Sequence, residues 1–180
     1  MKPTIYDTDC LSCFVTINYT EILEELFEKI YIPIEVYDEF NNQKTIKLKN
    51  RIDRLIEKGF VEILDTCTDS EDYELFLQLY SDFYNDKPIG KGESAVIVMA
   101  KKYNGIVASN NTKDIIPYIK KYGLERITTG DILIMAFKKG LINEKEGNSI
   151  WFKMLAYGRW LNAETFSDYL NLNEDNLKIY

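Results

Sequence analysis

Short apolar segments alternate along this chain with longer segments of helical periodicity, and this alternation constrains the fold more than any other feature. The segments that we expect to form strands are residues 4–7, 31–32, 61–64, 105–109 and 126–129. Between them, apolar side chains recur every three or four residues, as in helices that cover a sheet. Strands that alternate with helices are joined by right-handed crossovers and lie parallel. The sequence therefore predicts an α/β protein.

Two helical segments decide how the chain is divided. Residues 93–103, ESAVIVMAKKY, are apolar enough for a buried strand or a buried helix, and the strand-like segment directly after them favours the helix. Residues 144–180 have a helical pattern to the end of the chain and carry both tryptophans, Trp151 and Trp160. A chain of 180 residues can bury a core of its own. We predict one domain, residues 1–180, with 144–180 packed on it as a helical extension.

The sequence gives no sign of a membrane or of an oxidising compartment. No apolar run approaches the roughly 20 residues that span a bilayer, and the first ten residues lack the apolar stretch of a signal peptide. We therefore expect a cytoplasmic protein without a membrane partner. Cys10 and Cys13 have the spacing of a redox or zinc motif, but with only Cys67 left there is no second ligand pair. Two thiols buried on one face of a helix is the better interpretation.

Histidine is absent from the sequence, which narrows the chemistry. Its absence excludes the Ser-His-Asp triad, Cys-His proteases, histidine general bases and most catalytic zinc sites. Any catalysis must come from carboxylates, lysines, tyrosines, hydroxyls or a bound ion. A nucleotide-binding loop is not indicated, because GKGES matches neither common phosphate-binding motif.

Acidic residues follow several of the predicted strands. In a doubly wound sheet, ligands bind outside the carboxyl ends of the strands, so these positions can converge. The positions are Asp7 with Asp9, Glu39, Glu93, and Asp114 after Asn110 and Asn111. Each has a structural alternative: the first two can cap a helix, Glu93 suits a helix N-terminus, and Glu39 can be solvated surface. Asn111 and Asp114 can likewise cap the helix that contains Ile115 and Ile116. Their joint placement favours a site.

Four segments in this order resemble the motifs of PIN-domain nucleases. They are IYDTDCL, IPIEVYDEF, GKGESAVIVMAKKYNGIVASNNTKDI and ITTGDILIMAFKKGLI, and together they span residues 4–142. The last segment is similar to the final strand and helix of a longer subgroup, related to toxins of type II toxin–antitoxin pairs. The resemblance implies a PIN-like α/β/α sandwich with a mainly parallel central sheet.

The resemblance also implies hydrolysis of phosphodiester bonds, usually in RNA, with Mg²⁺ or Mn²⁺ held by carboxylates. The catalytic and metal-binding residues carried over are Asp7, Glu39, Glu93 and Asp114, with Thr8 and Ser109 orienting ligands or water. The fourth position stays open, because the family's final acid often stands where this chain has Asn111. Asp131, which heads the next helix, is the other candidate. Mg²⁺ keeps several waters, so two to four carboxylates suffice.

The net charge of −7 does not suggest a nucleic-acid binder, so any basic surface has to be local. Basic residues gather between Lys44 and Lys58, and acidic residues gather between Asp65 and Asp86. This asymmetry predicts a basic helix beside the cleft and an acidic surface elsewhere; a merely solvated helix face is an equal alternative.

We thus expect a metal-dependent endoribonuclease, which the resemblance connects to the toxins of toxin–antitoxin pairs. The partners that this implies are an RNA substrate and an antitoxin protein, and a homodimer is compatible with it. The alternative is a PIN-like module that binds a protein partner and has little catalytic activity. Binding of Mn²⁺ separates the two hypotheses, since an interaction module has no reason to bind the ion.

Overall fold

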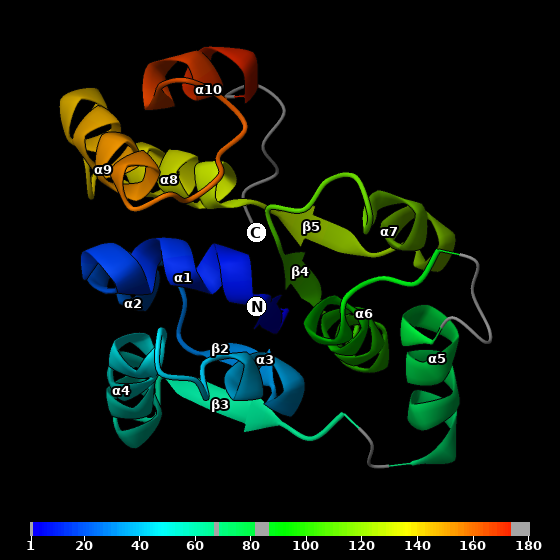
Figure 1. Cartoon of the computed structure of the whole chain (residues 1–180). Helices are drawn as coiled ribbons and strands as arrows, with labels where there is room; N and C mark the ends of the chain where they lie inside the picture. The colour runs from blue at the N-terminus through cyan, green and yellow to red at the C-terminus, as the bar shows by residue number, and fades with distance from the viewer. Residues whose placement is uncertain (1, 67–68, 82–86, 174–180) are drawn as a thin grey trace.

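Five parallel strands form the centre of the molecule in the order β3–β2–β1–β4–β5. The structure, a computed structural model, describes residues 2–66, 69–81 and 87–173 (Figure 1). The strands are β1 (Thr4–Tyr6), β2 (Ile30–Pro33), β3 (Val61–Leu64), β4 (Ile106–Ala108) and β5 (Glu125–Ile127). In the register of the sheet, Ile5 pairs with Tyr31 on one side and with Val107 on the other. The predicted α/β fold with a parallel sheet is confirmed.

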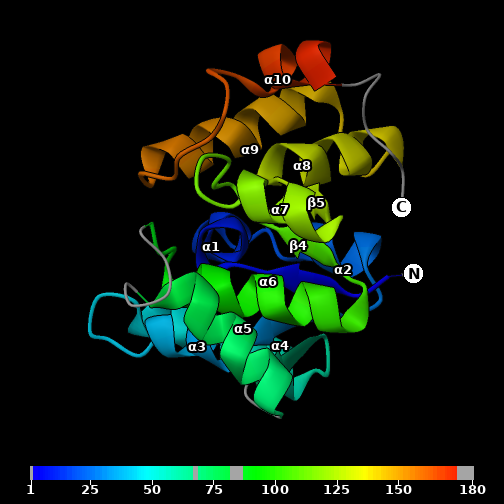
Figure 2. The same cartoon turned by 90° about the vertical axis from the view of Figure 1, so that its right-hand side faces the viewer.

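Helices cover both faces of this sheet (Figures 1 and 2). On one side lie α1 (Thr8–Ile17), α2 (Glu21–Leu26) and α4 (Ile46–Glu57), together with the C-terminal helices α8 (Thr129–Lys138), α9 (Glu144–Ala156) and α10 (Phe166–Asn173). On the other side lie α5 (Ser70–Tyr80), α6 (Lys91–Tyr103) and α7 (Ile116–Tyr122). The short helix α3 (Ile34–Glu39) follows β2 and packs against α6. No helix in the described ranges is long and apolar enough to cross a bilayer.

Helix α6 is the central helix of its layer. It contacts β1, β2 and β4 on one side and α3, α5 and α7 on the others. Its residues from Ala95 to Ala100 are all buried, which explains why this segment is apolar all round. The expected buried helix is confirmed, and its first turn is placed at the carboxyl edge of the sheet.

Two of the expected helices differ from the structure. Apolar residues recur at helical spacing from Ile22 to Ile30, which predicts a helix up to Ile30, but α2 ends at Leu26, and Ile30 instead begins β2, where it pairs with Val61. Pairing with β3 satisfies the backbone polar groups of Ile30, and this contact with a distant strand outweighs the helical spacing of its side chain. The C-terminal segment was expected to be helical to the end, but α9 stops at Ala156 and Trp160 lies in the loop before α10. Residues 174–180 lie outside the described residues.

The C-terminal extension packs closely on itself and on the domain. Trp151 of α9 is buried against Phe166 and Tyr169 of α10, and its indole N–H donates to the carbonyl of Ala163 at 3.2 Å. A Cβ at Gly147 would overlap the ring of Phe166, so only glycine permits this approach of α9 to α10. Helix α9 also contacts α1, and α10 contacts α8.

The direction of the chain crossovers reverses between β1 and β4. From β1 the chain proceeds to β2 and β3 on one side, whereas from β4 it proceeds to β5 on the other. In open α/β sheets, such a point leaves a crevice at the carboxyl ends of the two strands. Asp7 directly follows β1 and Ser109 directly follows β4.

Candidate metal centre

A small hollow with acidic walls lies at this carboxyl edge, which we call the acidic cavity. Its volume is about 220 Å³. The residues that line it come from the start of α1, the end of α3 and the start of α6: Asp7, Thr8, Asp9, Glu39, Gly90, Gly92 and Glu93. The structure therefore brings together three of the four predicted site acids, Asp7, Glu39 and Glu93.

Asp7 is the most buried of these acids. It caps α1, since its Oδ1 accepts a hydrogen bond from the backbone N–H of Cys10 at 2.7 Å, so the capping interpretation holds beside the functional one. Burial is the largest cause that raises the pKa of Asp7, from 3.8 to about 7. The negative charges of Asp9 and Glu93 raise it further, while hydrogen bonds from Ser109 and Cys10 lower it. A half-protonated carboxyl near neutral pH is one that a cation would ionise.

Glu39 is fixed by the groups around it. The hydroxyl of Thr8 donates to its Oε2, and the backbone N–H of Gly92 donates to its carboxylate. Burial raises the pKa of Glu39, and the charges of Asp9 and Glu93 add to the effect. A Cβ at Gly92 would overlap Oε1 of Glu39, so glycine is needed here for the carboxylate to lie over the first turn of α6. The expected orienting role of Thr8 matches this contact.

Glu93 is held at the N-terminus of α6 and linked to Asp114. Its Oε2 accepts from the backbone N–H of Gly90 at 3.0 Å, as an acid in a first helical turn commonly does. Its Oε1 accepts from Nδ2 of Asn111 at 2.6 Å, and the same Nδ2 donates to Oδ2 of Asp114 at 2.9 Å. Asp114 is exposed and does not line the cavity. Asn111 thus stands between the third predicted acid and the fourth.

Asp131 is engaged elsewhere. Its Oδ2 accepts from the N–H of Thr128 at 2.8 Å and from the hydroxyl of Thr128 at 2.9 Å, which closes a capping box at the start of α8. Its Oδ1 accepts from the hydroxyl of Tyr169 at 2.9 Å. Asp131 is not among the residues that line the acidic cavity.

Asp9 also lines the cavity, although it was not among the four predicted catalytic and metal-binding residues. It lies in the first turn of α1, is exposed, and contributes to the raised pKa of both Asp7 and Glu39. The signal was present in the sequence, since a residue two positions after Asp7 at a strand–helix junction can face the same hollow. Helix capping is the commoner role of such a residue, and that made it less conspicuous.

The donor set of the cavity suits a hard divalent cation. Four carboxylates line it, and no basic side chain among the described residues does. Oxygen ligands of this kind are what Mg²⁺ and Mn²⁺ prefer. Within the described ranges, no three acidic or thiol groups lie close enough to hold an ion by themselves. Mg²⁺ commonly uses only one or two carboxylates and fills its octahedron with water and substrate oxygens, so the cavity fits such an ion.

The basic helix α4 contributes less free charge than the sequence suggested. Lys49 pairs with Asp53 at 3.0 Å, and the guanidinium of Arg51 donates to the carbonyls of Val15 and Thr16 at the end of α1. Lys58 also pairs with an acid, Glu24. Lys44, Lys47 and Arg54 remain exposed, and their side chains form no ion pair with any described residue.

The two cysteines of α1 are buried thiols, as expected. Cys10 and Cys13 are free and have almost no exposed surface. The hydroxyl of Thr129 donates to Sγ of Cys10, and the amide of Asn110 donates to Sγ of Cys13, each at 3.5 Å. Burial raises the pKa of Cys13 to about 11, so both thiols stay protonated and unreactive. Cys67 lies outside the described residues.

Comparison with known proteins identifies the family of the chain. A family model described as a PIN domain matches residues 3–175, which is nearly the whole chain. A solved structure of FitAB bound to a DNA fragment is similar over 70% of this chain and 94% of that chain, with 17% sequence identity and a TM-score of 0.46. No curated protein sequence matches the chain.

Proposed function

Since the chain belongs to the PIN domain family, whose members are generally nucleases, we propose that it is a metal-dependent endoribonuclease. The observation that carries the proposal is the acidic cavity, where Asp7, Asp9, Glu39 and Glu93 meet at the switch point of the sheet. Mg²⁺ or Mn²⁺ held there would activate a water, polarise the scissile phosphate and neutralise charge that develops during hydrolysis.

The residues of the chain have distinct parts in this proposal. Asp7 and Glu93 would bind the ion directly, and Glu39 would bind it directly or through water. Thr8 and Ser109 hold the carboxylates of Glu39 and Asp7 in place. With ligands oriented before the ion arrives, less reorganisation is needed in the reaction.

The fourth acid has two candidates. Asp114 is connected to Glu93 through the amide of Asn111, which fits an outer role that orients Glu93 or a metal-bound water. Asp9 lines the cavity itself and can bind a hydrated ion from its rim. We keep Asp114 as the predicted fourth acid and add Asp9 to the set.

A toxin role is the more specific form of the proposal. It is supported by the similarity of residues 127–142 to the last strand and helix of the toxin-related PIN subgroup. FitAB, which shares part of this fold at low identity, was solved with a DNA fragment. An antitoxin and a homodimer are the protein partners that we propose. The cytoplasm is the proposed location, where the thiols of Cys10 and Cys13 stay reduced.

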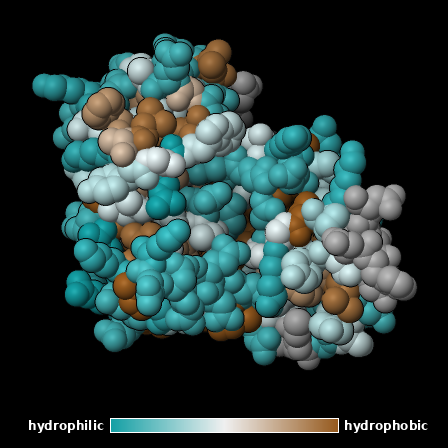
Figure 3. Space-filling view, in the orientation of Figure 1, coloured by the Kyte–Doolittle hydropathy of each residue, from teal (hydrophilic) through white to brown (hydrophobic). Residues whose placement is uncertain are grey.

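The alternative function is a PIN-like module that binds a protein and cleaves weakly. It is favoured by exposed apolar side chains on the C-terminal extension, where Phe152 is 71% and Leu172 is 72% exposed. Figure 3 shows hydrophobic residues gathered on the lobe that α9 and α10 form. This surface is compatible with a nuclease that also binds a partner.

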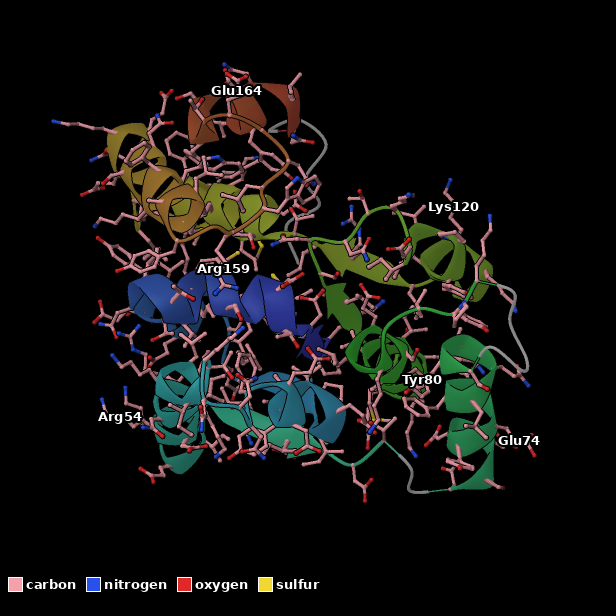
Figure 4. The ribbon with its side chains drawn as sticks, in the orientation of Figure 1. Arg54, Glu74, Tyr80, Lys120, Arg159 and Glu164 are labelled. Atoms are coloured by element: carbon pink, nitrogen blue, oxygen red, sulfur yellow. The ribbon has the colours of Figure 1, made fainter. Side chains whose placement is uncertain are left out.

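A cleavage assay tests the proposal. Wild type is expected to cleave single-stranded RNA with Mn²⁺ and to stop in EDTA, and Asp7→Asn and Glu93→Gln are expected to lose at least a hundredfold in rate. Glu164→Gln is the matched control, since Glu164 is an exposed acid beside α10, well away from the cavity (Figure 4). The proposal is wrong if wild type and both site variants cleave RNA at equal rates, or if none of the proteins cleaves it.

A further inference from the structure

A second hollow adjoins the acidic cavity, and its walls have a different character. We call it the Arg159 pocket; its volume is about 380 Å³. It shares Asp9 with the acidic cavity, and Asn111, which also lines it, donates to Glu93 of that cavity. Lys113, Arg159 and Trp160 complete the walls that matter here. A ligand that extends from the acidic cavity along this edge of the molecule would enter the pocket.

The end of α9 holds Arg159 in a fixed position. The N–H of Gly158 donates to the carbonyl of Leu155 at 2.8 Å, and the N–H of Arg159 donates to the carbonyl of Met154 at 3.0 Å. Gly158 has φ +73°, so this is a Schellman ending, in which glycine takes the left-handed conformation. The residues that follow, Arg159 and Trp160, are therefore presented by a rigid turn.

The guanidinium of Arg159 lacks a partner in the described part of the chain. Its Nε is buried and has no hydrogen-bond partner there, and no described carboxylate lies within ion-pairing distance of the group. Buried donors are nearly always satisfied, and leaving one without a partner costs free energy. An anion in the pocket would supply the missing acceptor. Figure 4 shows Arg159 between α1 and the C-terminal helices.

Trp160 adds a flat apolar surface beside this cation. Its side chain is 66% exposed, although the other tryptophan, Trp151, is almost fully buried. An exposed tryptophan next to arginine and lysine is typical of sites that bind single-stranded nucleic acid, where bases stack on the ring and phosphates bind the cations. Arginine suits phosphate because its planar fork can make paired hydrogen bonds.

We infer that the Arg159 pocket binds a nucleotide of single-stranded RNA next to the scissile phosphate, with the flanking phosphate on Arg159 and Lys113 and the base stacked on Trp160. This inference rests on the proposed nuclease function and locates a binding site for its substrate beside the acidic cavity. It also gives the C-terminal extension a role, since residues 158–160 belong to it. The acidic cavity repels phosphates until a cation binds, so a fixed positive group beside it would hold the strand in place.

Binding and cleavage, measured separately, test the inference. Anisotropy of a labelled polyuridine of about eight nucleotides, in EDTA, reports binding without cleavage. Trp160→Ala is expected to raise Kd roughly 5- to 150-fold, the range that the loss of one stacked base produces. Arg159→Met is expected to weaken binding and to lower the slope of log K against log salt by about 0.7. In Mn²⁺ both variants are expected to raise KM for cleavage more than they lower kcat.

Two matched controls lie on other surfaces. Phe152→Ala removes an aromatic ring that is 71% exposed on α9, and Lys120→Met removes one exposed positive charge on α7 (Figure 4). Neither residue lines the Arg159 pocket, so neither change is expected to alter Kd. The inference is overturned if Trp160→Ala and Arg159→Met bind RNA like wild type, if the two control variants weaken binding as much as they do, or if wild type binds no RNA in either EDTA or Mn²⁺.

The outcomes also separate this inference from the nuclease proposal. If Trp160→Ala leaves the RNA affinity unchanged but alters the oligomeric mass, the exposed ring belongs to a protein interface and the inference fails. If the variants change binding as expected while wild type cleaves nothing, RNA binding in the Arg159 pocket is supported and the nuclease proposal is wrong. If wild type cleaves RNA and the variants have an unchanged KM, the nuclease proposal is supported and the proposed role of the Arg159 pocket is wrong.

Discussion

Asp7→Asn is expected to stabilise the metal-free protein at pH 8. A pKa raised from 3.8 to about 7 corresponds to roughly 4 kcal/mol of preference for the protonated form above pH 7. Asparagine is neutral at every pH and remains a good helix cap, so Cys10 N–H keeps its acceptor. The start of α1 already favours the ionised form within this net shift, so the gain stays at about 4 kcal/mol, or roughly 8 to 16 °C in melting temperature for a chain of this size.

The pH dependence gives this prediction its sign. Because the folded-state pKa of Asp7 is raised, its contribution to stability is fully present below about 3.8 and is lost as the pH rises through about 7. Wild type should therefore lose stability between pH 4 and pH 8 relative to Asp7→Asn, and the two should melt alike near pH 4. With Mn²⁺ in excess the difference should shrink, since the ion stabilises wild type more than a variant that lacks one of its carboxylate ligands.

Thermal and urea unfolding in EDTA at pH 4, 6 and 8 measure the stability gain of Asp7→Asn and its dependence on pH. A repeat at pH 8 with Mn²⁺ measures how the ion changes the difference between the two proteins. Asp168→Asn provides a control, because Asp168 is an exposed acid in the first turn of α10. A destabilised Asp7→Asn at pH 8 in EDTA would refute the reasoning, since it would mean that Asp7 is fully ionised and stabilising in the empty site.

Four further predictions follow from the same site. Millimolar Mn²⁺ should stabilise wild type by about 2.7 kcal/mol at a hundredfold excess over Kd, measured as a thermal shift, and Glu93→Gln should blunt that shift; no shift in wild type would favour the partner-binding module. Gly92→Ala should displace the carboxylate of Glu39 and lower Mn²⁺-dependent cleavage at least tenfold; a full rate would show that this contact is unimportant. Asp114→Asn should lower cleavage while leaving the melting temperature in EDTA nearly unchanged, and a normal rate would remove Asp114 from the site. Asn111→Asp should lower the melting temperature in EDTA, because it adds a charge beside two carboxylates, and should tighten Mn²⁺ binding measured by calorimetry; weaker binding would contradict it.

The fold was predictable because its signals are local and repeated. All five strands lie within a few residues of the expected segments, and parallel pairing follows from the helices between them. The pattern of apolar residues could not predict where α2 ends, because tertiary structure decides that boundary. Ile30 has helical spacing from Leu26, yet the strand partner Val61 lies far along the chain. Strand pairing competes with the helix at Ile30 only once the sheet has folded.

The candidate site was predictable to the extent that it depends on strand ends. Asp7, Glu39 and Glu93 each adjoin an element that starts or ends at the carboxyl edge of the sheet, so the topology brings them together. Asp114 and Asp131 could not be ranked in the same way, because both lie at or near helix starts on that edge. Their side-chain contacts separate them: one connects to Glu93 through an amide, and the other closes a cap with Thr128.

The side-chain amide of Asn111 keeps the carboxylates of the site in position when no metal ion is bound. Its Nδ2 donates to Glu93 and to Asp114 at once, and its Oδ1 accepts from the backbone N–H groups of Lys113 and Asp114. A carboxylate at this position could accept those backbone bonds but could donate none, and it would add a charge to a cavity that already repels itself. Asparagine therefore holds Glu93 in position when no cation is present. With asparagine instead of aspartate at position 111, the carboxylates of the metal-free site repel one another less and stay oriented. The site then also has one negative charge fewer to attract the ion, so its affinity for Mn²⁺ is lower than it would be with aspartate.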